Sequence, residues 1–222
     1  MNTSRKMATR KAAYQSGFSM VEILVSLIIL LVGLLGLAGL MVQSQRSEME
    51  SYQRVQALIL LQDMAGRVNA NRNVAICYAI TTTFASGSPN LGASPTIPGT
   101  IPPACVNGTA TQRAQYTADM TAWHNLLLGA AESGSGAAGA MIGARGCISY
   151  GGTTTEVNDV NANKIVGSGI YTIAVAWQGL GETYAPAPID APAMNCGKNQ
   201  YGTTNAQRRI VSLTFRVGAI NN

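Results

Sequence analysis

A long apolar segment constrains this chain more than any other feature. From Ile23 to Val42 there are 20 consecutive residues without a charge, and a helix needs about 20 such residues to cross a bilayer. Glu22 stands immediately before them. A carboxylate within a membrane helix costs on the order of 2.5–3.5 kcal/mol, so it indicates a function that requires a partner.

Basic residues are concentrated ahead of this segment. The net charge is +5, and Arg5, Lys6, Arg10 and Lys11 lie in the first 16 residues, which contain no acid. Without residues 1–17, 11 Lys and Arg face 10 Asp and Glu, which leaves +1. The basic flank predicts a cytoplasmic N-terminus, with the C-terminal part across the membrane. No basic patch with interleaved aromatic residues remains, so no direct nucleic-acid partner is predicted.

Two simpler interpretations of the apolar segment are an unprocessed signal anchor and a cleaved secretory signal peptide. A secretory apolar region is about 7–15 residues long and ends at a small-residue cleavage site, whereas this segment is longer. Neither interpretation explains Glu22. A cut just before Phe18 would supply a partner, because the new α-amino group would lie within about one helical turn of Glu22, in its own chain or a neighbour's.

The stretch GFSMVEILVSLIIL resembles the N-terminal signature of type IV prepilins and pseudopilins. A basic leader, 1–17, ends in Gly17 and is followed by Phe18, then by Glu22 at the fifth mature position, within an apolar stretch over 18–42. The resemblance implies that prepilin peptidase cleaves after Gly17 and N-methylates Phe18. It also implies that Glu22 pairs with the Phe18 amine of an adjacent subunit during assembly.

The helical pattern continues over residues 43–72. Charged residues there mostly separate apolar ones, which predicts an amphipathic half-helix with its apolar stripe on a globular domain. From Phe18 to about Arg72 the helix would be about 80 Å long. The predicted stripe comprises Met49, Tyr52, Val55, Leu58 or Ile59, Leu61, Ala65 and Val68.

Residues 73–222 are predicted to form a periplasmic globular domain. Residues 73–111, rich in Thr, Ser, Pro and Gly, are interpreted as an irregular loop, and 112–132 as a short helix. Strand-like runs at 147–150, 170–178 and 209–217 predict a three- or four-stranded antiparallel sheet within 145–217, and the last two alternate as half-buried strands do. The predicted fold class is therefore α+β and type IV pilin-like: a long N-terminal helix packed on a small antiparallel sheet with a second short helix.

Four cysteines lie beyond the apolar segment, and charged residues make up 11% of the chain, against about 25% in ordinary soluble domains. Both features favour an oxidising compartment. The spacings match no metal or redox signature, and three pairings are open. Cys77–Cys105 and Cys147–Cys196 are favoured because they close local loops.

The C-terminal half sharpens the resemblance. It has Asp119 four residues before Trp123, a glycine-rich turn, a strand ending VAWQG, then CG, and a final strand opening with RR. With VGLLGLAGL in the apolar segment, this order resembles the minor pilins called type IV pilus modification proteins. Such proteins sit with other minor pilins at the pilus tip or in the complex that primes assembly.

Catalytic chemistry is not predicted. The chain has one histidine, His124, which is interpreted as a solvated or core-edge residue because no Cys or carboxylate cluster accompanies it. No nucleophile elbow, P-loop or dinucleotide fingerprint occurs. No cofactor or metal is expected. The remaining acids and the pair Arg208–Arg209 are interpreted as surface charge; those acids are Asp119, Glu132, Glu156, Asp159, Glu182 and Asp190.

These observations together predict a structural, non-catalytic minor pilin that helps prime and assemble the type IV pilus and supports twitching motility or adhesion. The predicted partners are prepilin peptidase, other minor pilins, the major pilin, the inner-membrane assembly platform and, through 18–42, the lipid bilayer. The predicted location is the bacterial inner membrane and then the pilus. The alternatives are a minor pseudopilin of type II secretion and an unprocessed, signal-anchored periplasmic domain.

Overall fold

The computed structural model describes residues 17, 19–83, 85–92, 104–129, 141–186, 192–202 and 204–218. Contacts within the chain divide it into two compact units, Met1–Arg46 and Ser47–Asn222. The predicted leader, 1–17, lies outside the described residues except for Gly17, as do Phe18 and, within the predicted loop 73–111, residues 84 and 93–103. The predicted α+β class is confirmed: a long N-terminal helix, short helices and a small antiparallel sheet.

The long helix α1 runs from Met20 to Ala70. The strong helix formers Leu, Ala, Met and Gln make up 24 of its 51 residues. The predicted continuation into an irregular loop was wrong at its first residues. A 3₁₀ turn, η1 (Arg72–Val74), and a one-turn helix, α2 (Ala75–Tyr78), follow α1 directly. The chain therefore reverses in two short helical turns.

The second helix, α3, spans Ala110–Leu127, so the predicted 112–132 was displaced. Its start is set by a capping box. The Thr109 hydroxyl accepts from the Gln112 amide (3.3 Å), while the Gln112 side chain accepts from the Thr109 amide (2.9 Å). These bonds satisfy two backbone donors that the first turn of a helix leaves unpaired. At the other end Leu128 and Gly129 form a turn, and residues 130–132 lie outside the described part.

The described residues form one three-stranded antiparallel sheet in the order β1-β2-β3. Its strands are β1 (Ile142–Tyr150), β2 (Gly169–Gln178) and β3 (Arg208–Val217). Ile148 on β1 pairs with Ile173 on β2, which pairs with Leu213 on β3. The 3₁₀ turns η2 (Thr153–Thr155) and η3 (Pro192–Asn195) lie in the connections.

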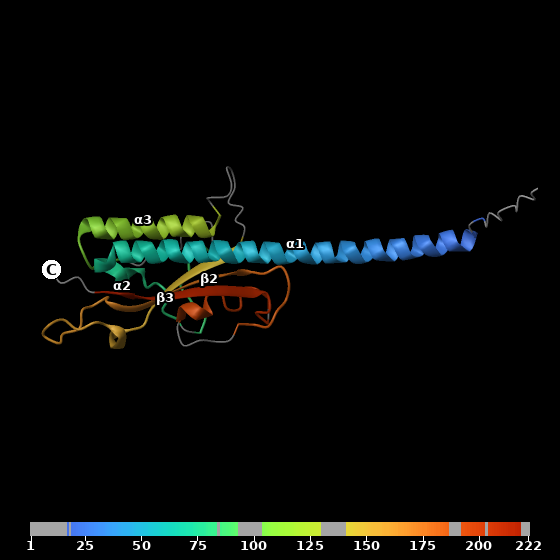
Figure 1. Cartoon of the computed structure of the whole chain (residues 1–222). Coiled ribbons are helices and arrows are strands. Elements are labelled where there is room, and N and C mark those ends of the chain that lie inside the picture. The colour runs from blue at the N-terminus through green and yellow to red at the C-terminus, as the bar shows by residue number, and fades with distance from the viewer. Residues whose placement is uncertain are drawn as a thin grey trace, which may run out of the picture. The chain divides into compact units, whose positions relative to one another are not determined.

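Within Ser47–Asn222, α1 lies between α3 and the sheet (Figure 1). The main core fills this space and includes Leu61, Met64, Trp123 and Ile173, all at most 1% exposed. Gly146 on β1 allows α3 to approach the sheet, because a side chain there would overlap the ring of Trp123. The Trp123 indole N–H also donates to the Leu60 carbonyl at 3.0 Å, which ties α3 to α1.

The predicted apolar stripe of α1 was only partly right. Leu61, Ala65 and Val68 are buried as predicted, but Tyr52 and Val55 are more than half exposed. The reason is geometric. Tyr52 and Leu61 are nine residues apart, about two and a half turns at 3.6 residues per turn, which places them on opposite sides of the helix. The buried face instead comprises Gln53, Ala57, Leu61, Met64, Ala65 and Val68.

The prediction of half-buried strands was wrong for β2, where Ile173 and Val175 face the main core but Ala174 and Ala176 are also fully buried. A second, smaller core covers the other face of the sheet. It includes the Cys147–Cys196 disulfide and Tyr201, whose hydroxyl donates to the Gly143 carbonyl at 2.6 Å. The segment after η3 is therefore fastened over β2, and the central strand is enclosed on both sides.

Candidate functional site

The residues singled out from the sequence lie at the start of α1. Gly17 is exposed, and Gly17 and Ser19 lie outside the helix, which begins at Met20. The Ser19 carbonyl accepts from the amides of Glu22 (2.9 Å) and Ile23 (3.3 Å), so Ser19 opens the first turn. Phe18, the predicted methylation position, lies outside the described residues.

Glu22 is exposed in the first turn of α1. An acid is favourable there, because the unpaired N–H groups at a helix N-terminus carry a partial positive charge. Among the described residues, the ion pairs of the chain lie elsewhere and none includes Glu22. The described part of the chain therefore supplies this carboxylate with a helix terminus but with no cationic side chain.

The apolar part of α1 is exposed along its whole length. The large apolar side chains of residues 20–42 range from 49% exposed at Ile23 and Val25 to 81% at Met20. The described residues contain one helix that is long and apolar enough to cross a membrane, and it is α1. A core helix of a soluble domain would be mostly buried, so this segment requires lipid or other helices as its surroundings.

The comparison with protein families matches residues 13–38 to the prokaryotic N-terminal methylation motif. The matched residues include Gly17, Phe18, Glu22 and the first part of α1. The chain thus carries a type IV pilin-like prepilin signature, in register with the residues predicted from the sequence. Neither the curated proteins nor the solved structures contained a match to the chain.

The signature supports a protein of the type IV pilin or pseudopilin type. It implies processing by prepilin peptidase and assembly with other pilins, and it suits a single-pass inner-membrane anchor. The signature therefore suggests a structural rather than an enzymatic protein. The fold agrees with this class of protein, since the apolar helix continues into a small α+β unit.

The four cysteines form two disulfides in the structure. Cys77 is bonded to Cys105 and Cys147 to Cys196, with Cα atoms 5.4 and 5.7 Å apart. These are the pairs favoured from the sequence. Both lie in the Ser47–Asn222 unit. The first closes the segment that links α2 to α3, and the second fastens the η3 segment to β1.

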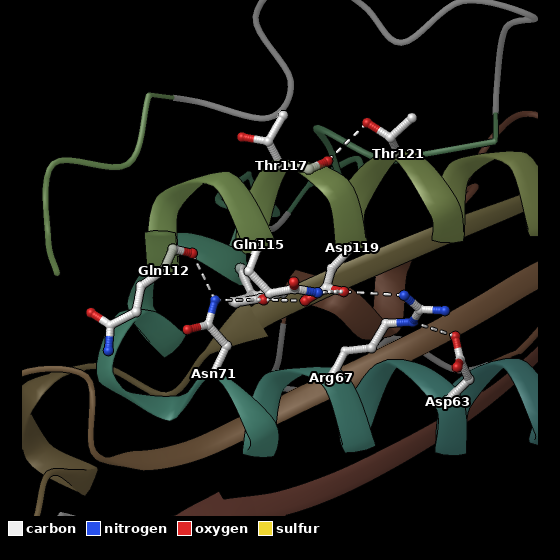
Figure 2. Close-up of polar contacts among 9 residues, drawn as sticks. Asp63, Arg67, Asn71, Gln112, Gln115, Thr117, Asp119 and Thr121 are labelled. Atoms are coloured by element: carbon white, nitrogen blue, oxygen red, sulfur yellow. Dashed lines mark hydrogen bonds and ion pairs between the residues drawn. The ribbon is translucent and has the colours of Figure 1, made fainter. Parts of the chain in front are cut away.

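A buried polar cluster joins α1, α2 and α3, and sequence reasoning missed it. Asp119, predicted as surface charge, is only 3% exposed. Its carboxylate accepts from the Tyr78 hydroxyl (2.6 Å), the Gln115 amide (2.8 Å) and the Arg67 guanidinium (3.1 Å). Figure 2 shows Arg67 on α1 and Asp119 on α3 pointing toward each other, with Asp63 on the other side of the Arg67 guanidinium.

This cluster stabilises the fold. Burial raises the pKa of the Tyr78 hydroxyl, and the hydrogen bond to Asp119 raises it further. Tyr78 therefore stays a neutral donor to a charged acceptor, which is a strong type of hydrogen bond. The spacing of Asp119 four residues after Gln115 and four before Trp123 was the available sequence signal, because it places an acid on the face of α3 that also carries the buried tryptophan.

Two further residues are buried: His124, interpreted from the sequence as solvated or core-edge, and Arg208, interpreted as surface charge. His124 is 1% exposed, and its Nδ1 accepts from the Gly92 amide at 3.1 Å. Arg208 is 2% exposed, and its guanidinium donates to the carbonyls of Cys196 (3.0 Å) and Met194 (3.3 Å). Burial lowers the pKa of Arg208. Neither burial could be predicted from the sequence, because both depend on loops that fold over the sheet and helix.

Within the described ranges, no three His, Cys, Asp or Glu side chains come together as metal ligands would. Of the other acids predicted at the surface, Glu182 is exposed, Asp159 is partly exposed and binds the turn at Asn161–Asn163, and Glu132 and Asp190 lie outside the described residues.

Proposed function

We propose that this chain is a minor pilin that helps to prime and assemble a type IV pilus, and so supports twitching motility or adhesion. The observation that carries the proposal is the exposed apolar half of α1, headed by Glu22 and matched by the methylation motif. Before assembly the helix spans the inner membrane with its N-terminus cytoplasmic and residues 73–222 in the periplasm. Its partners are prepilin peptidase, the assembly platform, other minor pilins and the major pilin.

Processing takes place between Gly17 and Phe18. Gly17 and Ser19, on either side of Phe18, lie outside the helix. This supports the proposal, because a peptidase cleaves peptide bonds that are accessible and not held in a helix. Cleavage removes the basic leader, and methylation modifies the new Phe18 amine. The cationic amine is then one turn from Glu22 along the sequence.

Glu22 pairs with the Phe18 amine of an adjacent subunit. In the membrane an unpaired carboxylate is costly, on the order of 2.5–3.5 kcal/mol at the helix centre. An incoming amine offsets part of that cost only in the assembled state. The acid therefore favours docking of subunits in one register over retention in lipid.

The apolar helix moves from lipid into a bundle of pilin helices during assembly. Side chains that are exposed in the isolated chain, such as Leu31 and Leu34, exchange one apolar environment for another. Little apolar surface meets water, so extraction has a small hydrophobic cost. The globular unit, which buries its own core, keeps its fold throughout.

The deciding experiment is the intact mass and N-terminal sequence of the membrane-extracted protein from a host with active prepilin peptidase. A chain that starts at methylated Phe18 is expected. A chain that still starts at Met1 would show an ordinary anchored domain and refute the proposal. Deleting the gene then separates the two assembly systems: loss of pili supports the minor pilin, and loss of type II secretion supports a pseudopilin.

Glu22→Ala tests the pairing itself. The variant is expected to insert into the membrane at least as well as the native chain, because it loses a costly charge, yet to be poorly incorporated into pili. Immunoblots of sheared pili and of membranes measure both quantities. Glu182→Ala, which removes an exposed acid of the globular unit, is the matched control for insertion and incorporation. Normal incorporation of Glu22→Ala into pili would refute the proposed pairing of Glu22 with the Phe18 amine.

A further inference from the structure

The two outer strands of the sheet differ in what lies along their free edges. The outer edge of β1 is paired with the chain's own segment ahead of α3. Gly146 and Leu91 exchange backbone hydrogen bonds of 2.9 and 3.0 Å, and the Ile148 carbonyl accepts from the Thr81 amide at 2.8 Å. β3 forms the opposite edge of the sheet. Among the described residues, no hydrogen bond reaches the outer backbone edge of β3 between residues 210 and 216.

The pairing pattern shows which backbone groups of β3 face outward. Successive residues of an antiparallel strand direct their N–H and C=O groups alternately to the two sides. Ile148 bonds outward from β1, so its partner Ile173 on β2 directs its groups away from β1 and bonds to Leu213 on β3. The residues on either side of Leu213 therefore direct their groups to the free edge. Along β3 the outward groups belong to Ile210, Ser212, Thr214 and Arg216.

β3 lacks most of the features by which edge strands avoid pairing with other chains. Such strands are usually short, bulged, interrupted by proline, charged along their length or covered. β3 is 10 residues long, contains no proline and pairs with β2 in unbroken register, whereas the register of β1 shifts near its start. Residues 210–215 carry no charge, and Arg208, Arg209 and Arg216 stand at the two ends. The middle of this edge is therefore open to an extended chain.

A groove of about 300 Å³ lies beside the start of β3. Glu50 and Arg54 of α1 line it, together with Arg209 and Val211 of β3. Ile210, whose backbone faces outward, lines it as well, so the groove reaches the free edge. Alternate side chains of a strand lie on the same face of a sheet. A strand added to β3 would therefore direct a side chain into this groove.

Charge indicates which side chain the groove would hold. Arg209 forms an ion pair with Glu50 at 3.1 Å, whereas Arg54 is exposed and has no ion pair among the described residues. The groove thus holds two arginines and one acid, which favours an acidic side chain. The same charges disfavour a second copy of this chain. Each β3 carries three arginines and no acid, and like charges on paired strands are destabilising.

We propose that the free edge of β3 binds an extended segment of a different protein by strand addition, with an acidic side chain of that segment in the groove. The outward N–H and C=O groups of β3 supply the backbone hydrogen bonds, as in other proteins that add a strand to an exposed sheet edge. Because the edge of β1 is already paired, each chain takes one such segment. The inference goes beyond the proposed function, since it concerns the Ser47–Asn222 unit and requires neither cleavage of the leader nor the pairing of Glu22.

The test uses the full chain in detergent micelles and a synthetic peptide as long as β3, with alternating Thr and Val residues and Glu at each end. The two Glu residues place an acid near the arginines of β3 in either strand direction. Amide hydrogen exchange, followed by NMR, is the first measurement. Without peptide, the amides of Ser212 and Thr214 are expected to exchange fast, and those of Val211 and Leu213 slowly, because the latter bond to β2. The peptide is expected to slow the first pair and leave the second pair unchanged.

Ser212→Pro tests the hydrogen bonds directly. It removes an outward N–H that is not bonded to β2, a position where an edge strand tolerates proline. Its binding of the fluorescently labelled peptide, measured by anisotropy, is expected to weaken about tenfold, because a hydrogen bond is lost and a peptide carbonyl is left unpaired. Ser212→Ala, which keeps the N–H, is the matched control and is expected to bind as the native chain does. Slow exchange at Leu213 in both variants verifies that β3 is intact, and Thr214→Pro is a second variant with the same expectation.

Several results would overturn the inference. Slow exchange of Ser212 and Thr214 without peptide would show that the edge is already covered, by the chain itself or by a second copy. Equal peptide binding by Ser212→Pro and Ser212→Ala would exclude strand addition at this edge. Equal binding of a peptide with Lys in place of Glu would exclude the acidic side chain. A chain that starts at methylated Phe18 but does not bind the peptide overturns only the strand addition, whereas a chain that starts at Met1 overturns only the proposed function.

Discussion

The two halves of α1 are parts of one helix but depend on different surroundings. Over residues 20–42 every side chain is exposed. Over residues 47–70 six side chains, including Leu61 and Val68, are buried against α3 and the sheet. The second half is stabilised by the chain's own core, while the first must be stabilised by lipid or by other helices. A chain can therefore complete the fold of one half and leave the other for assembly.

Two carboxylates show the same contrast. Asp119 is buried and accepts hydrogen bonds from three side chains of its own chain. Glu22 is exposed at a helix N-terminus and has no ion pair among the described residues. An acid whose partners lie within the chain serves stability, whereas an acid without them is available to another molecule.

Removing the first half of α1 should give the largest effect. A chain of residues 47–222 is expected to be soluble and to unfold cooperatively, because its core lies within that unit. The full chain is expected to stay in the membrane fraction until detergent is added. Sedimentation and circular dichroism measure the two properties. If the shortened chain lacks helical and sheet signals, the globular unit depends on the apolar half of α1 for its fold. The two halves would then not differ in what stabilises them.

Asp119→Ala should have the next largest effect. It leaves the buried Tyr78 hydroxyl without its acceptor, while Arg67 keeps Asp63. A buried donor that loses its acceptor costs about 1–3 kcal/mol. The free energy of unfolding of residues 47–222 in urea measures the loss.

Asp63→Ala is the matched control for that variant. Asp63 also pairs with Arg67, but its side chain is 34% exposed, and partly exposed pairs contribute about 0–1 kcal/mol. Similar losses in the two variants would show that burial does not distinguish them. Membrane retention of the full chain should be unchanged in both.

Alkaline pH should have the smallest effect, and it sharpens the comparison because residues 20–46 contain no tyrosine. Burial raises the pKa of Tyr78, Tyr171 and Tyr201 above the ordinary 10.0. The unfolded chain then loses these protons at lower pH than the folded one does. Their stabilising contribution is complete below about pH 10 and is lost as the pH rises further.

Urea unfolding of residues 47–222 at pH values below and above 10 measures whether the free energy of unfolding falls as the pH rises. Tyr78→Phe is expected to make that fall smaller. A free energy of unfolding that rises through that range would contradict it.

Local patterns were enough to predict α1, α3 and the strands of this protein, but not η1 and α2. The apolar segment and its length predicted a long helix, alternation predicted strands that became β2 and β3, and the leader, Gly17, Phe18 and Glu22 predicted the prepilin signature. Each of these depends on residues close together in the sequence. The start of α3 was also predictable in principle, since Thr109 and Gln112 form a capping box.

Tertiary structure decided which face of each element is buried. Successive spacings of three residues drift around a helix, so the sequence did not separate the side of α1 that carries Leu61 from the side that carries Tyr52. The burial of Asp119, His124 and Arg208 likewise depends on groups that are distant in the sequence. The sequence by itself determined that there is a long apolar segment with a prepilin signature, because both are local. Only the fold decided which faces of the helices and strands are buried, because burial depends on what packs against each face.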